Sequence, residues 1–161
     1  MLKQMPTQQE LVTFIEEKAR AIIEGGVEHA PMLFVQGADG WFATVLANLT
    51  DEMKAGWQEV IPAILRRFQA RGYIFITEAW MAEAKTDTAL GRELANGQKQ
   101  VSELPLDDRR EILWLVAVEK GQPPRMMWAG IDNTPAGRRM RKLEPALSGA
   151  DIGGRMVVRD W

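Results

Sequence analysis

The apolar residues of this 161-residue chain first recur at helical spacing, between two helix-boundary signals. Thr7-Gln8-Gln9-Glu10 matches a capping box, in which the threonine hydroxyl and the glutamate carboxylate bind free backbone amides. Gly25-Gly26 favours a helix end. The pattern predicts an amphipathic helix between them, with an apolar stripe at three- and four-residue intervals: Leu11, Val12, Ile15, Ala19, Ile22 and Ile23.

Two short apolar runs then flank a turn. Residues 31–36 and 41–46 are separated by Gly37-Ala38-Asp39-Gly40, so the segment predicts a β-hairpin. A second amphipathic helix is expected to begin at Thr50 and to end at Gly72. Pro62 lies inside its apolar pattern and cannot donate to the Gln58 carbonyl, which predicts a kink or two abutting helices.

Three longer apolar segments read as strands, at 73–82, 112–118 and 126–131, and a last short strand is expected at 155–159. Two polar segments are less regular. Residues 84–110 suggest one helical turn near Leu90–Leu94, and residues 132–154 suggest a helix from Arg138 to Leu147, interrupted by Pro145.

The element order is α-β-β-α-β-β-β plus a C-terminal strand. This order predicts an α+β fold, a mainly antiparallel sheet with two helices on one face. The length fits a single globular domain spanning residues 1–161, large enough to fold without a metal or a disulfide.

Composition narrows the chemistry. The chain has no cysteine and one histidine, which excludes thiol catalysis, disulfides, thiolate zinc sites and multi-histidine metal sites. His29 follows the first helix and is expected to be a polar loop residue. No phosphate loop, dinucleotide fingerprint, nucleophile elbow or metalloprotease motif is present, so we expect no cofactor and no metal.

Location and bulk charge give few further clues. The polar N-terminal residues do not resemble a signal peptide, and no apolar run approaches the length of a membrane span. With no cysteine to suggest export, a cytoplasmic location and no membrane partner are expected. A net charge of −2 indicates no polyanionic partner by itself.

The alternation of strand 73–82 singles out Glu78, which shares a face with Ile74, Ile76 and Trp80. A carboxylate in apolar surroundings must find a partner or raise its pKa. Glu78 is therefore either a general base or ligand-binding acid, or a structural carboxylate paired with an arginine, and structural pairing is the commoner outcome.

A second acidic group depends on topology. If strands 73–82 and 112–118 are antiparallel neighbours, one end of the sheet gathers carboxylates that could bind magnesium or calcium: Glu83, Asp107, Asp108, Glu111 and Asp132. Arg109 and Arg110 lie among them and could neutralise them instead. Without ordered ligand spacing, an ion-paired sheet end is the favoured interpretation.

One dense basic run covers residues 137–142. Its four cations could neutralise phosphates of a nucleic acid: Arg138, Arg139, Arg141 and Lys142. The run is short and no nucleic-acid motif accompanies it, so an exposed helix face or mobile loop is expected, at best a weak polyanion binder.

Three of the six tryptophans lie on consecutive predicted strands, and they are candidate interface residues: Trp80, Trp114 and Trp128. Those strands alternate apolar with apolar, so two helices on one face would leave the other face bare. A homodimer would cover it. The competing solution is that the C-terminal strand and Trp161 fold over the same face.

Three function classes remain. The favoured one is a non-enzymatic, dimerising interaction or accessory module, with a further protein partner left open. The second is a nucleic-acid-associated protein that uses the 137–142 run. The third is a hydrolase or ligand-binding enzyme with a carboxylate site at Glu78 or at the Glu83, Asp107 and Asp108 end of the sheet.

Overall fold

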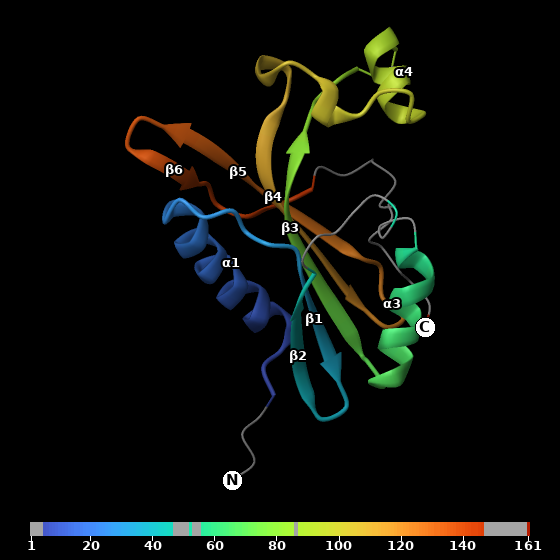
Figure 1. Ribbon diagram of the computed structural model, residues 1–161. Helices are drawn as coiled ribbons and strands as arrows, with labels where there is room; N and C mark the ends of the chain where they lie inside the picture. The colour runs from blue at the N-terminus through green and yellow to red at the C-terminus, as the bar shows by residue number, and fades with distance from the viewer. Residues whose placement is uncertain (1–4, 47–51, 53–55, 86, 147–160) are drawn as a thin grey trace.

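A computed structural model describes residues 5–46, 52, 56–85, 87–146 and 161. Figure 1 shows one sheet with helices packed against it and a smaller lobe beyond one end of the sheet. The described elements, in chain order, are α1 (Gln8–Glu24), β1 (Met32–Gly37), β2 (Gly40–Val45), α3 (Trp57–Arg67), β3 (Gly72–Met81), α4 (Ala89–Ala95), the 3₁₀ turns η1 (Val101–Glu103) and η2 (Leu106–Asp108), β4 (Arg110–Glu119), β5 (Arg125–Thr134), β6 (Gly137–Met140) and β7 (Glu144–Pro145).

The sheet is antiparallel throughout its described strands. Its order is β2-β1-β3-β4-β5-β6, and the short β7 pairs with β5. The expected hairpin at 31–46 is confirmed, with Gly37 opposite Gly40 at the turn. The strands expected at 73–82 and 112–118 are also antiparallel neighbours, so the predicted α+β class is confirmed.

The first helix begins as the sequence indicates. The Thr7 hydroxyl accepts from the Glu10 amide at 3.1 Å, and the Glu10 carboxylate accepts from the Thr7 amide at 3.1 Å. This capping box satisfies amides that have no partner inside the helix. The Gly25 amide closes the other end on the Ala21 carbonyl at 3.1 Å.

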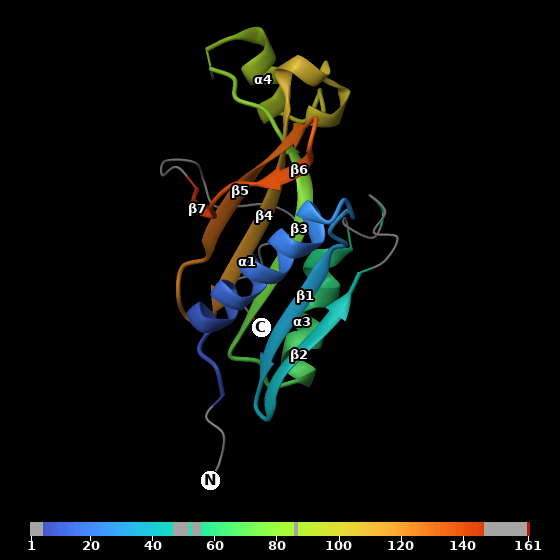
Figure 2. The same cartoon turned by 90° about the vertical axis from the view of Figure 1, so that its left-hand side faces the viewer.

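The two long helices lie on opposite faces of the sheet, which corrects the expectation of two helices on one face. In Figure 2, α1 crosses in front of the strands and α3 lies behind them. The α1 side buries residues of α1 against alternate residues of the central strands, namely Val12, Ile15, Ala19 and Ile23 with Ile74, Ile76, Leu113, Leu115, Ala117, Ala129, Ile131 and Met140. The α3 side buries the intervening residues, with Trp57, Ile61 and Leu65 packed on Leu33, Val35, Ala70, Tyr73, Phe75, Val116 and Val118.

The strand sequences explain this arrangement. Successive side chains of a strand point to opposite faces, and β3 and β4 are apolar at most positions of both faces. Each face of these strands therefore needs its own cover. One helix per face supplies it within a single chain, so the expectation of a bare face needing a partner loses its basis.

The second helix and the polar segments differ in part from expectation. The predicted start at Thr50 lies outside the described residues, and so does the strand expected at 155–159. The helix α3 runs through Pro62 as one element. The helical turn expected near Leu90–Leu94 is confirmed by α4.

The helix expected from Arg138 to Leu147 is wrong, because this segment forms β6 and β7. The long strand β5 extends to Thr134, and the chain then reverses through a tight turn closed by a 2.7 Å hydrogen bond from the Thr134 hydroxyl to the Gly137 carbonyl. Gly137 has a φ of 120°, which other residues rarely adopt. Once the turn forms, residues 137–140 find an adjacent strand edge, and pairing with β5 outweighs their helical pattern.

We predict that the side chains buried on each face of the sheet contribute to the free energy of unfolding. Ile15→Ala in α1 and Ile61→Ala in α3 should each lower the free energy of unfolding by about 2–5 kcal/mol, because each removes a buried side chain. Ile22→Ala, at a residue of α1 that is 38% exposed, is the control and should cost less than about 1 kcal/mol. Urea unfolding measures all three, and an Ile61→Ala cost equal to that of the control would contradict a two-faced core.

Candidate functional site

Glu78 lies near the middle of β3, on the face that α1 covers. It pairs with Leu113 of β4 and shares its face with Ile76. Its side chain is 6% exposed. The expectation of a carboxylate in apolar surroundings is therefore confirmed, as is the expectation of a basic partner.

The partner is Arg138 of β6, 60 residues away in the sequence. Its Nη2 donates to Glu78 Oε1 and to Glu111 Oε1, both at 2.7 Å, and its side chain is 17% exposed. Glu111 is in turn held by Asn133, whose Nδ2 donates to its second carboxylate oxygen at 3.0 Å. We call Glu78, Glu111 and Arg138 the carboxylate–arginine cluster.

This cluster has unequal charges, since two carboxylates share one guanidinium. Burial raises the pKa of Glu78 above its ordinary value, and this effect outweighs the opposing hydrogen bond and charge of Arg138. The negative charges of Glu111 and Glu28 raise this pKa further. For Arg138, burial alone would lower the pKa, but the hydrogen bonds and charges of the two glutamates raise it overall.

The contacts of the cluster are better suited to stabilising the structure than to catalysis. A carboxyl with a raised pKa can hold a proton, as a general acid must. However, the guanidinium already occupies Glu78, and neither of the two pockets described below is lined by any residue of the cluster. The contacts join β3, β4 and β6, so the cluster fixes the outer hairpin of the sheet to its centre.

The basic run at 137–142 belongs to the same junction, which corrects the expectation of an exposed helix face or mobile loop. Arg141 forms two hydrogen bonds to Asp132, at 2.7 and 3.1 Å, and these lower the pKa of that carboxyl. The Met140 and Leu143 amides donate to glutamates of α1 at 3.4 and 3.0 Å. The helix α1 therefore holds this segment against the sheet.

Two of the four candidate nucleic-acid-binding cations are thereby paired. Arg138 and Arg141 bind carboxylates of the sheet, whereas Arg139 and Lys142 are exposed and form no ion pair with an acidic group among the described residues. The run is thus weaker as a phosphate-binding patch than four free cations would be.

The acidic residues expected to gather at one end of the sheet differ in exposure and in partners. Glu83 is exposed beyond the end of β3, and Asp107 and Asp108 are exposed in η2. Glu111 belongs to the carboxylate–arginine cluster, and Asp132 pairs with Arg141. Among the described residues, no three His, Cys, Asp or Glu side chains lie close enough together to hold a metal ion.

The candidate interface tryptophans occupy different faces. Trp80 is 39% exposed, with the Arg109 guanidinium 4.1 Å from its ring centre. Trp114 and Trp128 are half-buried and directly opposite each other in register, on the face that α3 covers. Trp161 also packs on that side, where its indole donates to the Ala70 carbonyl at 2.8 Å and its ring meets Tyr73 edge-on. This contact agrees with one part of the alternative to a dimer, in which Trp161 and the C-terminal strand fold over the sheet face.

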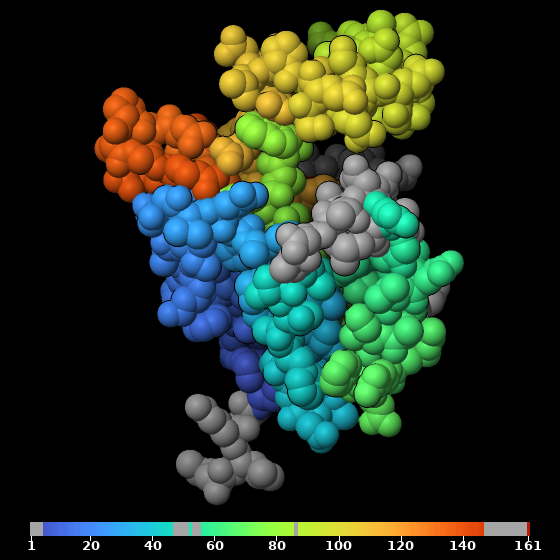
Figure 3. All heavy atoms as spheres, in the orientation of Figure 1, coloured from blue at the N-terminus to red at the C-terminus, as the bar shows by residue number. Residues whose placement is uncertain are grey.

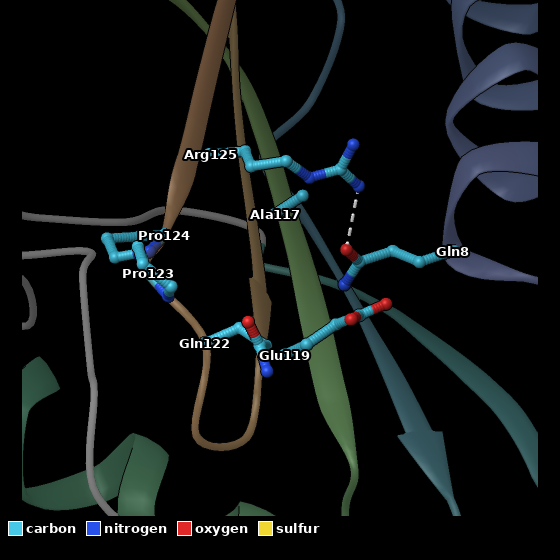
Figure 4. Close-up of a pocket in the computed structure, with 7 residues that line it drawn as sticks. All are labelled: Gln8, Ala117, Glu119, Gln122, Pro123, Pro124 and Arg125. Atoms are coloured by element: carbon cyan, nitrogen blue, oxygen red, sulfur yellow. Dashed lines mark hydrogen bonds between the residues drawn. The ribbon is translucent and has the colours of Figure 1, made fainter.

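Two open pockets of about 350 Å³ each lie at the end of the sheet near the β4–β5 turn. Figure 4 shows the first, where Gln8 of α1 reaches Arg125 of β5. The Gln8 amide donates to the Val118 carbonyl at 3.1 Å and accepts from Arg125 at 2.8 Å, so both of its polar ends are occupied. The second pocket is lined in part by Arg66, Arg71 and Lys120.

The apolar periodicity did not predict that Gln8 is buried, because Gln8 is polar. The capping-box pattern specifies only Thr7 and Glu10 and says nothing about the residues between them. Gln8 is 3% exposed, and the available signal for its burial was its spacing of four residues from Val12 in the apolar stripe.

The burial of His29 was also not expected from the sequence. It lies in a loop as expected but is buried, and this burial lowers its pKa although its ring nitrogen Nδ1 lies 2.8 Å from the Ala30 carbonyl.

The edge strand β2 presents an uncharged apolar surface. Its residues Phe42–Val45 are all exposed, with Phe42 at 44% and Val45 at 52%. The Phe42 ring contacts the exposed ring of Phe68, with 4.8 Å between ring centres. Residues 31–46 contain one charged residue, Asp39, although 26% of the whole chain is charged. We call Phe42–Val45 with Phe68 the β2 surface, and Figure 3 shows β2 at the surface between α1 and α3.

Comparison of this chain with protein-family models, curated proteins and solved structures finds no match. Within the described ranges, no helix is long and apolar enough to cross a membrane.

We predict that the carboxylate–arginine cluster stabilises the fold. Glu78→Ala should lower the free energy of unfolding by about 1–3 kcal/mol at neutral pH, because it removes one acceptor from the poorly exposed Arg138. Glu83→Ala is a matched control at an exposed glutamate past the end of the same strand, and it should change stability by less than about 0.5 kcal/mol. Equal urea midpoints for the two variants would show that the cluster contributes nothing measurable.

We also predict a pH dependence with a definite sign. A carboxyl with a raised pKa in the folded state binds a proton more tightly folded than unfolded. The stability that Glu78 contributes should therefore fall as pH rises from its ordinary value of 4.5 through the raised value, and then level off. Glu78→Gln cannot titrate, so the stability of the wild type minus that of this variant should decrease over the same window. Urea titrations from about pH 4 to about pH 8 test this, and a difference that grows with pH would refute it.

Proposed function

We propose that this protein is a non-enzymatic interaction module that works as a homodimer. The observation that carries the proposal is the β2 surface, an exposed, uncharged and mainly apolar strand in a chain of which 26% of the residues are charged. Charged residues are depleted at the centre of protein interfaces, and aromatic residues are enriched there. The proposed contact therefore differs from the Trp80, Trp114 and Trp128 face that the sequence suggested.

The reason for this shift is the position of the helices. The tryptophan interface required a sheet face left bare by both helices, whereas α1 and α3 each cover one face. The strand β2 is the edge strand of the sheet, and none of its six residues is buried. Three exposed large apolar side chains, Phe42, Val45 and Phe68, gather at this edge of the sheet.

The two alternative functions have less support. The nucleic-acid alternative loses two of its four cations to ion pairs with Glu78, Glu111 and Asp132. The carboxylate-enzyme alternative would need Glu78 to release Arg138, and its other acids, Glu83, Asp107 and Asp108, are exposed. A cytoplasmic location, which we keep as part of the proposal, rests on the absence of cysteine from the whole sequence.

The proposal predicts a particle of twice the chain mass of 18.1 kDa. Size exclusion with light scattering should show this mass at roughly tens of micromolar protein, with dissociation on dilution if the dimer is weak. Association through apolar surface should also persist at high salt, where contacts between exposed charges are screened. A mass of one chain across the whole concentration range would refute the homodimer.

A further inference from the structure

The outer edge of β2 offers a row of backbone hydrogen-bonding groups. In an antiparallel pair, residues alternate between those that exchange hydrogen bonds with their partner strand and those whose N–H and C=O point away. The Leu46 amide donates to the Pro31 carbonyl at 2.7 Å, which sets this alternation for the β1–β2 pair. Thr44 and Phe42 then bond to β1, and the backbone groups of Trp41, Ala43 and Val45 point outward.

The described part of the chain leaves this edge open. The strand β2 ends the sheet order, and its only described partner is β1. Proteins usually protect such edges with a lysine, a proline, a bulge or a covering segment, because an open edge templates pairing with another chain. Here β2 contains neither a charged residue nor a proline, and its register with β1 runs from Gly40 to Val45 without a bulge.

We propose that two copies of this chain pair through the outer edges of β2, antiparallel about a twofold axis, to form one continuous sheet. This inference rests on the proposed homodimer and names its contact surface. The occupant is a second copy because a twofold contact sets each strand against itself, so that a charge on or beside the axis would lie next to its own copy. A strand with no charge on either face meets this requirement.

The side chains beside the edge favour the same arrangement. On the α3 side, the Phe42–Phe68 ring pair lies beside the edge, and on the α1 side Ala43 and Val45 are exposed. Across a twofold axis these groups would meet their counterparts, and apolar contacts would flank the new backbone hydrogen bonds. Edge pairing with side-chain contact on both sides is an established mode of recognition between chains.

The decisive variant is Ala43→Lys, which places a charge near the centre of the strand, on the α1 side of the edge. It should weaken self-association by about tenfold or more, measured as the dissociation constant by light scattering or sedimentation. Ala43→Thr, a neutral and β-favouring change at the same position, should leave the dimer intact. Ala95→Lys places the same charge on an exposed residue of α4, at the far end of the molecule from β2, and should also leave it intact.

Amide hydrogen exchange on the wild type gives a second measurement that needs no variant. Amides of Trp41, Ala43 and Val45 should become protected as protein concentration rises, because pairing places them in hydrogen bonds. Concentration-dependent protection there, together with dissociation by Ala43→Lys alone, supports the inference. A dimer that withstands Ala43→Lys and leaves these amides unprotected overturns the β2 contact but leaves the proposed homodimer standing. A monomer at every concentration overturns both.

Discussion

The central constraint of this structure is a pair of long antiparallel strands, β3 and β4, that are apolar on both faces. Burying one face would leave the other in water at a cost of about 25 cal/mol for each Å² of apolar surface. The chain meets the constraint with one helix on each side, so Ile74 and Ile76 pack under α1 while Tyr73 and Phe75 pack under α3. The positions of the loops, the outer strands and the ion pairs follow from this arrangement.

One consequence concerns the outer hairpin of β5 and β6. Its strand β6 lies beside the N-terminal helix, where the side chain of Met140 joins the apolar core and Arg138 forms ion pairs with the sheet. A buried carboxylate that loses its arginine leaves an uncompensated charge, so the carboxylate–arginine cluster favours one register of the hairpin over others. Glu78 therefore positions β6 through its ion pair with Arg138. Its raised pKa is a consequence of its burial at this contact.

The other consequence concerns the opposite edge. Because α1 and α3 are committed to the centre of the sheet, β2 receives no layer of its own among the described residues. Its apolar side chains Phe42 and Val45 therefore remain exposed to water at the edge of the sheet. The proposed function and the proposed twofold contact both follow from that uneven cover, since a second copy supplies what the chain itself does not.

The sequence by itself determined the local elements and the character of single positions. The capping box at Thr7, the hairpin at residues 31–46, the strands β3 to β5 and the apolar setting of Glu78 all follow from spacing and alternation, which act over a few residues. It did not determine which face each helix covers, that Arg138 is the partner of Glu78, or that residues 137–140 form a strand. Those outcomes depend on contacts between residues far apart in the chain, where an available strand edge or a buried charge outweighs local propensity. Tertiary structure alone therefore decided that both faces of the central strands are covered and that β2 is an exposed edge strand.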